Sequence, residues 1–442
     1  MRTISYSQIG HIAYPILISS LMEQLIGMTD TAFLGRVGEI ELGASALGGV
    51  FYATVFMIGL GFSMGAQILM ARRNGEGKVQ QIGSIFYHSL VFLLLLALLL
   101  FGITRICSPW ILGHIIRSEE VFHAANAYLH WRVIGFFFAF VNLMFRAFYV
   151  ATTHTRTLTL NSAIMVASNV LFNYLLIFGH CGLPALGIAG AAIGSSLAEG
   201  VSTLFYILHT RRHIPYQRYG LHIPPRLHFH LLWRILGISV WTMVQNFLSL
   251  STWFIFFVSV EHLGEHYLAA TNILRSISAF TFMTVMAFAS TACTLVGNLM
   301  GSRDADSVGN MLKRTNLLCF LILIPILLII ALFPMQFMSI FSTDPVLLHT
   351  GHDALYVLLA SYVFTVPAQI FLAAVSGTGN THMALRFEFV SLFFYTIYVV
   401  VAIFMLRVSL PLCWASEFVY NFFSFILSWS YMRWGKWSTK QI

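Results

Sequence analysis

Residues 38–44 read GEIELGA, and residues 264–270 read GEHYLAA. The two stretches share Gly, Glu, Leu and Ala at the same places, at a shift of 226 residues. The same shift carries a second group of residues onto a matching group: Leu69, Gly75 and Gly83 onto Leu295, Gly301 and Gly309. A shift of about 225 also brings 153–160 roughly onto 378–385. Because the repeated segments are apolar, they indicate a duplicated membrane half, which is typical of secondary transporters.

The composition excludes a water-soluble fold. Of the 442 residues, 58% are hydrophobic and 9% are charged, and the mean hydropathy is +0.81. The apolar runs are continuous and about 20 residues long or longer, which suits helices that cross a bilayer. The alternating pattern of barrel strands is missing. The sequence predicts twelve spans, near residues 9–34, 44–71, 82–104, 127–150, 158–179, 185–209, 229–260, 268–300, 313–336, 352–375, 384–406 and 409–432.

We therefore expect an all-α integral membrane protein with two pseudo-symmetric bundles of six helices each. Residues 1–210 are predicted to form the N-terminal lobe and residues 229–442 the C-terminal lobe. The basic, proline-containing segment 211–228 between them is predicted to be a cytoplasmic linker. Lys and Arg gather on the cytoplasmic side of membrane proteins. With the N-terminus inside, seventeen of these residues fall on inner segments and five on outer ones, namely Arg36, Arg105, Arg117, Arg132 and Arg407. We thus expect a multi-pass protein of the inner (plasma) membrane. Both of its termini are expected to lie in the cytoplasm.

Several other classes of protein find no support in the sequence. The formal charge of +8 lies on short connectors, and no soluble basic module is visible that would bind nucleic acid. The five cysteines have no CxxC spacing, and the histidines of 209–230 have no fixed ligand spacing, so neither a disulfide framework nor a dedicated metal site is expected. A membrane-embedded enzyme such as a prenyl transferase would need clustered carboxylates for magnesium pyrophosphate, and the sequence has no such cluster. We expect a non-enzymatic chain that acts as a monomer without a cofactor.

Two acidic residues lie in the first predicted span. An ionisable group in the bilayer core is costly unless it is paired or hydrated, so such residues point to function. Asp30 is a candidate for binding a proton or sodium ion, and the alternative is an aspartate capped by nearby hydroxyls or placed at the outer interface. Glu23 lies seven residues earlier on nearly the same helical face. It is predicted either to share a proton with Asp30 or to pack as a protonated glutamic acid.

Other residues complete the candidate coupling site. Asn169 and Asn173 are four residues apart, so they share one helical face and could bind a carboxylate or a sodium ion. Helix-packing hydrogen bonds are the alternative for both. Pro15 can bend the first helix, either as part of gating or as a static kink. Glu199 either faces a cavity or pairs with a basic residue.

Polar residues in both halves are candidates for the lining of a cavity. They are Gln24, Gln67, Glu199, Gln245, Asn246 and Asn272. Each taken alone is more often a hydrogen bond between helices. Together with many Phe and Met side chains, they suit an adaptable pocket for amphipathic molecules.

The order of several motifs resembles the multidrug and toxic compound extrusion (MATE) family over essentially the whole chain. The motifs are Pro15…Asp30-Thr31…Gly35-Arg36-Val37-Gly38, Gln67…Arg72…Gly75-x-Gly77, Arg146…Thr153-x-Thr155-Arg156, Ser168-Asn169…Asn173-Tyr174…Phe178-Gly179, Gly187-x-Ala189-Gly190-Ala191-Ala192 and Ser376-Gly377-x-Gly379-Asn380-Thr381. The resemblance implies two six-helix lobes and antiport of cationic or amphipathic organic compounds against protons or sodium.

The resemblance also implies where coupling takes place. In the DinF-like branch, the cation site uses the helix-one aspartate, here Asp30, a helix-five asparagine, here Asn169, and an aspartate four residues later. This last position is Asn173, which disfavours sodium and leaves Asp30 dependent on Glu23. The NorM-like branch places acids in helices seven and ten, where this chain has only Glu261 at the outer end of helix seven and Asp353 at the start of helix ten. We therefore expect DinF-like coupling in the N-terminal lobe, with H⁺ as the coupling ion and Na⁺ at Asp30, Asn169 and Asn173 as the alternative. The alternative function is a lipid-linked precursor flippase of the same superfamily, although Arg146 and Arg275 are its only candidate headgroup ligands.

Overall fold

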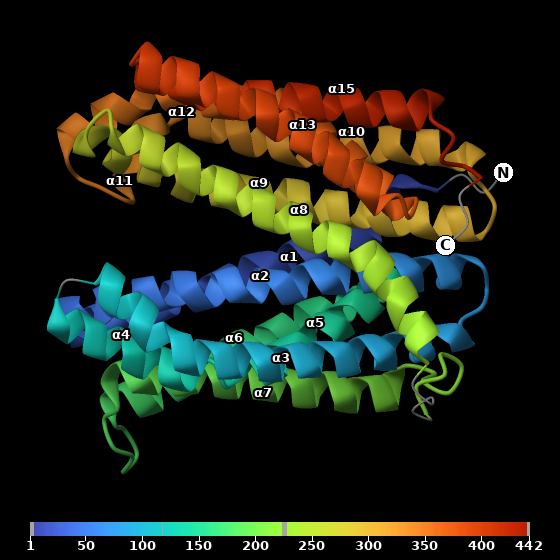
Figure 1. The fold of residues 1–442 in the computed structure, drawn as a ribbon, viewed down its shortest axis with the longest axis horizontal. Helices are drawn as coiled ribbons and strands as arrows, with labels where there is room; N and C mark the ends of the chain where they lie inside the picture. The colour runs from blue at the N-terminus through green and yellow to red at the C-terminus, as the bar shows by residue number, and fades with distance from the viewer. Residues whose placement is uncertain (1–3, 117, 223–227, 440–442) are drawn as a thin grey trace. The chain divides into compact units, whose positions relative to one another are not determined.

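The computed structural model describes residues 4–116, 118–222 and 228–439 (Figure 1). Arg117 and residues 223–227 of the predicted linker lie outside this described part. The described part is helical and contains no strand. Its N-terminal half forms α1 (Tyr6–Val37), α2 (Glu39–Gly75), α3 (Gln80–Ile115), α4 (Glu119–Arg132), α5 (Gly135–Ala151), α6 (Arg156–Phe178) and α7 (Gly187–His213). Its C-terminal half forms α8 (Phe229–Glu261), α9 (Glu265–Gly301), α10 (Asp306–Leu332), α11 (Pro334–Ser339), α12 (Pro345–Gly377), α13 (Thr381–Val399), the π-helix η1 (Val400–Met405), α14 (Leu410–Trp414) and α15 (Ser416–Trp434).

The predicted membrane architecture is confirmed. Eleven helical spans of the described residues are long and apolar enough to cross a bilayer, and the pair α4 and α5 makes up to twelve. The repeat also appears in the helix boundaries, because α2 and α9 are both 37 residues long and begin 226 residues apart. The two glycines that open the repeated stretches, Gly38 and Gly264, directly precede these helices.

The fourth span differs from the single helix predicted over 127–150. It consists of α4 and α5, which are bent by 50° relative to each other at a short break. Gly135 begins α5 beside a tight ion pair, and a Cβ at this position would collide with Arg132 Nη1 and would lie 2.5 Å from Glu199 Oε2. The break and the glycine therefore make room for a charged pair that the apolar pattern did not predict.

The chain divides into two compact units whose boundaries lie inside helices. One unit comprises Ile18–Met243, and the other comprises Met1–Leu17 together with Val244–Ile442. The first part of α8 thus belongs to the unit of the N-terminal half, where Ser239 Oγ donates to the Phe62 carbonyl (3.1 Å) and Thr242 Oγ1 donates to the Gly61 carbonyl (2.7 Å). The first part of α1 belongs to the other unit, where Arg314 Nη1 donates to the Ile4 carbonyl at 2.5 Å.

Candidate functional site

Asp30 closes a ring of four polar side chains inside the unit Ile18–Met243. Its Oδ1 accepts a hydrogen bond from Asn173 Nδ2 at 2.5 Å, and its Oδ2 accepts one from Ser195 Oγ at 3.0 Å. Asn169 Nδ2 donates to Ser195 Oγ at 3.1 Å, and Asn173 Nδ2 also donates to Asn169 Oδ1 at 3.2 Å. The two asparagines are fully buried and Ser195 is nearly so. The three predicted residues are thus brought together, with Ser195 as an additional member.

The helix pair α6 and α7 positions this ring. Asn169 and Asn173 share a face of α6 because they are one helical turn apart, and α7 packs closely along that face. Gly194 precedes Ser195 on α7, and a Cβ at this position would lie only 2.5 Å from Asn173 Oδ1. The glycine therefore allows the close approach that brings Ser195 to Asp30.

The ring contains an acceptor without a donor. Among the described residues, buried Asn173 Oδ1 has no hydrogen-bond partner. The oxygen and nitrogen of an amide can exchange places by a side-chain flip, which would turn Oδ1 toward Asp30. An oxygen facing a carboxyl oxygen needs a proton or a cation between them. The ring therefore has the chemistry to hold either one.

A second charged network lies close to the ring. Arg132 of α4 binds Glu199 of α7 in a bidentate manner, with Nη2 2.6 Å from Oε1 and Nη1 3.1 Å from Oε2. The Arg132 guanidinium lies 3.8 Å from the ring centroid of Tyr52, whose hydroxyl donates to Glu199 Oε1 at 3.3 Å. Arg132 also attracts the Asp30 carboxylate electrostatically without forming an ion pair with it. Of the two alternatives for Glu199, the structure shows pairing with a basic residue. The distribution of basic residues predicts Arg132 on an outer segment, and the structure places it at the end of α4.

Glu23 has a different environment from Asp30. Arg146 Nη1 lies 3.1 Å and 3.0 Å from the two carboxylate oxygens of Glu23, and Arg146 Nη2 donates to Ser20 Oγ at 3.2 Å. Ser19 and Ser162 also donate to Glu23 Oε1, at 3.2 Å and 3.3 Å. No hydrogen bond joins the described side chains of Glu23 and Asp30. Both acids are on α1, about 10 Å apart along its axis, so any proton exchange between them would need an intermediary.

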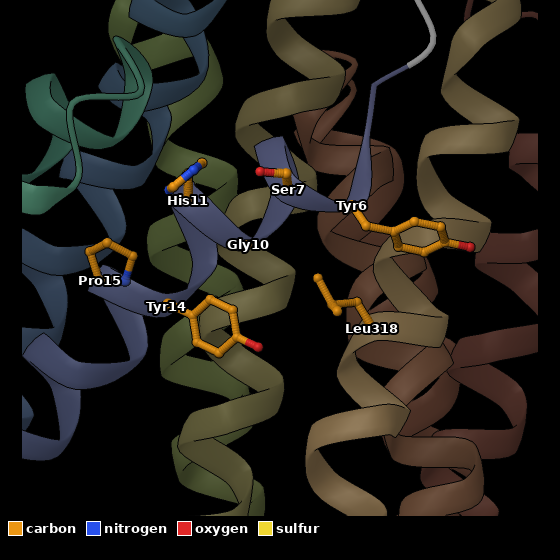
Figure 2. A pocket seen from close by; sticks show the side chains of 7 residues that line it. All are labelled: Tyr6, Ser7, Gly10, His11, Tyr14, Pro15 and Leu318. Carbon is orange, nitrogen blue, oxygen red and sulfur yellow. The ribbon is translucent and has the colours of Figure 1, made fainter.

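Pro15 lies within the continuous helix α1, two residues before the boundary between the units. It is at one end of a shallow apolar groove of about 260 Å³. Figure 2 shows Leu318 of α10 between the rings of Tyr6 and Tyr14 in this groove. None of the other predicted site residues lines it, so the groove is separate from the ring around Asp30.

The residues predicted to line a cavity divide between the two units. Gln24, Gln67 and Glu199 belong to the unit Ile18–Met243, whereas Gln245, Asn246 and Asn272 belong to the other. Asn272 is exposed, and Gln24 and Gln245 are half-buried. Gln245 hydrogen-bonds to Glu388 within its own unit.

Comparison with known proteins identifies the family. Residues 15–175 and 242–405 match the MatE family model, which covers both repeats. The chain belongs to the MatE family. The predicted family is thus confirmed, and membership identifies a multi-pass membrane transporter rather than an enzyme.

Relatives and solved structures support this assignment to the MatE family. The chain is 24% identical to the "Probable multidrug resistance protein NorM" of Thermotoga maritima over 384 residues, which cover 86% of this chain and 82% of the relative. It is 23% identical to the protein of the same name from Pasteurella multocida over 362 residues, 81% of this chain and 77% of the relative. Neither name specifies the DinF-like branch, which stays a prediction.

The fold is that of solved MATE structures. The outward-facing conformation of a multidrug resistance MATE family transporter of the MOP superfamily matches with a TM-score of 0.89 at 17% identity, over 99% of this chain and 97% of that chain. A MOP superfamily transporter from Pyrococcus furiosus matches with a TM-score of 0.87 at 17% identity, over 97% and 95% of the two chains.

Proposed function

We propose that this MatE protein is a secondary active efflux antiporter that exports cationic or amphipathic organic compounds in exchange for protons. The single observation that supports coupling at Asp30 is the ring of hydrogen bonds that it forms with Asn173, Asn169 and Ser195. The names of the NorM relatives support multidrug efflux as the activity. In this proposal the two lobes alternate access across the inner membrane, and the chain acts as a monomer with both termini in the cytoplasm.

Protons are preferred to sodium because of the chemistry of the ring. Asp30 is its only carboxylate, and two of its three other members present amide groups. Burial favours the uncharged form of a carboxyl group, so binding a proton removes an unpaired charge from the membrane interior. The Asn173 and Ser195 contacts that hold the charged form keep proton release accessible.

The flippase alternative receives less support. A pocket for a pyrophosphate headgroup needs several free arginines, but Arg132 and Arg146 are each paired with a glutamate. Arg275, the remaining candidate within a span, lies 5.7 Å from the Phe257 ring centroid.

A flux assay in proteoliposomes tests the proposal. Ethidium serves as a fluorescent organic cation, and a pH gradient is imposed in sodium-free buffer. We expect gradient-driven ethidium movement that collapses when a protonophore is added. A strict requirement for sodium with no response to the pH gradient would contradict proton coupling. Movement independent of either gradient would contradict antiport.

A further inference from the structure

The unit that contains Val244–Ile442 buries a carboxyl group of its own. Glu388 of α13 is 1% exposed. Its Oε1 accepts a hydrogen bond from Ser249 Oγ of α8 at 2.6 Å. The Tyr420 hydroxyl of α15 lies 3.0 Å and 2.9 Å from the two carboxyl oxygens. Gln245 of α8 hydrogen-bonds to the same carboxyl, and Gln369 of α12 hydrogen-bonds to Tyr420.

The internal repeat relates this cluster to the environment of Glu23. The shift of 226 residues that aligns α2 with α9 carries Glu23 onto Ser249 and Ser162 onto Glu388. In each repeat these two positions are joined by a hydrogen bond, at 3.3 Å between Ser162 and Glu23 and at 2.6 Å between Ser249 and Glu388. The carboxyl and the hydroxyl have therefore exchanged helices between the repeats.

The exchange leaves Glu388 without the cation that Glu23 has. Arg146 pairs with Glu23, whereas no lysine or arginine among the described residues forms an ion pair with Glu388. Arg386 lies two residues earlier on α13 but is exposed, and its Nη1 contacts Met383 Sδ. The other titratable groups around the cluster are Tyr420 and Glu417 of α15, Tyr395 of α13 and Tyr362 of α12.

The partners of Glu388 suit a carboxyl that gains and loses a proton. A hydroxyl group can donate to a carboxylate or accept from a carboxylic acid, so the contacts with Ser249 and Tyr420 survive in both states. An arginine has no such freedom, because it can only donate. A buried carboxylate without a cation is also unfavourable in a bilayer, which favours the protonated state.

The neighbouring turn of α15 carries a second acid, Glu417, beside the buried amide of Asn421. Asn421 is 1% exposed, and its Oδ1 has no hydrogen-bond partner among the described residues. Its Nδ2 lies 3.4 Å from Glu417 Oε2. The same Nδ2 donates to the Glu417 backbone carbonyl at 2.8 Å, which fixes the orientation of the amide. Ser424 and Ser428 continue this buried row of unpartnered polar atoms along α15.

We propose that Glu388, with Ser249 and Tyr420 as its hydrogen-bond partners, is a proton-binding site of the second unit, separate from Asp30. The ligand of this site is a proton. Glu417 and Asn421 lie next to it on the neighbouring turn of α15. The site would give this transporter a second proton to exchange for its cargo. Equilibrium binding of this proton does not depend on transport, so it can be tested even if the proposed function fails.

Infrared spectroscopy of the full chain in lipid tests the site directly. The carbonyl stretch of a protonated carboxyl is separate from the amide bands, and it is followed as the pH is raised in the Asp30→Asn background. We expect a band at acidic pH that is lost at alkaline pH and is missing after Glu388→Gln. Tyr420→Phe should move the band to higher frequency, because the carbonyl loses a hydrogen bond. Glu120→Gln, at an exposed glutamate of α4, is the matched control and should leave the titrating band unchanged.

Three outcomes would overturn the proposal. The first is a Glu388→Gln variant that folds, as judged by size-exclusion chromatography, and retains the whole titrating band. The second is a band that does not change with pH over the range in which the protein stays folded. The third is loss of the band on addition of sodium at constant pH, which would indicate a metal cation site. If Glu388→Gln does not fold, Tyr420→Phe provides the test, and an unshifted band in that variant contradicts the assignment.

Discussion

Arg146 holds Glu23 through both carboxylate oxygens, at 3.1 Å and 3.0 Å from one guanidinium nitrogen. Asp30, on the same helix, has only neutral hydrogen-bond donors. The two acids of α1 therefore differ in the charge that faces them. Glu23 links α1 to α5 through this ion pair, whereas no lysine or arginine of the described residues forms an ion pair with Asp30.

The first prediction concerns Asp30. An asparagine preserves its shape but cannot carry the charge that a coupling ion neutralises. Asp30→Asn should therefore reduce gradient-driven ethidium transport to the rate of protein-free liposomes, while the variant inserts and elutes as a folded protein. Asp353→Asn, at an acid whose side chain is 80% exposed, is the control and should transport normally. Parental transport by Asp30→Asn would make Asp30 a structural residue.

The second prediction concerns the spacing of α6 and α7. A Cβ at position 194 would lie 2.5 Å from Asn173 Oδ1, so Gly194→Ala should displace Asn173 from Asp30. Asn173 donates to the charged form of Asp30, so losing this hydrogen bond destabilises the carboxylate by about 1.5–3 kcal/mol. Proton binding should then become roughly tenfold or more stronger. The measurement is the proton concentration that half-saturates transport. Gly200→Ala is the control on the same helix, because its Cβ would meet only Phe138 ring atoms at 3.7 Å. If Gly194→Ala and Gly200→Ala have the same half-saturating proton concentration, the contact between Asn173 and Asp30 does not contribute to coupling.

The third prediction concerns the ion pair between Glu23 and Arg146. These side chains are 38% and 29% exposed, so each single change to glutamine should cost about 1 kcal/mol or less. The double variant should be more stable than the sum of the single changes predicts, as measured by thermal unfolding in detergent. The pH profile of transport by Glu23→Gln then decides its role. A shifted profile indicates that Glu23 exchanges protons with Asp30, and an unchanged profile indicates that it only anchors α1.

The fourth prediction concerns Arg132 and Glu199, which are only 12% and 13% exposed. Glu199→Gln leaves a buried guanidinium without its counter-charge, which should destabilise the protein by roughly 3–5 kcal/mol. The midpoint of thermal unfolding should fall accordingly, and replacing Arg132 by glutamine as well should recover part of the loss. A Glu199→Gln variant with parental stability would mean that water already solvates this pair.

The fifth prediction concerns topology, which the distribution of basic residues predicts. A cysteine introduced at Arg218 should react with an impermeant maleimide only after the cells are permeabilised. Exposed Cys181 is the internal control and should react in intact cells, once the other four cysteines are replaced by alanine. Labelling of position 218 from outside would reverse the predicted orientation.

The sequence predicted the helices better than it predicted the polar contacts. Hydropathy and the repeat located nearly every span, because a membrane helix must satisfy its backbone within about 20 apolar residues. The i, i+4 spacing of Asn169 and Asn173 likewise predicted a shared face. Arg132 and Glu199 are 67 residues apart, and no local pattern joins them. Ser195 lies in a helix that is rich in Gly, Ala and Ser. The sequence of such a helix does not distinguish a serine that contacts Asp30 from one that only packs between helices.

The boundary of the units inside α1 has a consequence for biosynthesis. The segment Met1–Leu17 leaves the ribosome first, but it belongs to the unit completed by Val244–Ile442. At about 5–20 residues per second, the whole of Ile18–Met243 takes on the order of tens of seconds to emerge. During that time the start of α1 has no partners from its own unit. Its final packing therefore has to wait for the last half of translation, and a chain truncated after α7 would leave this segment permanently without them.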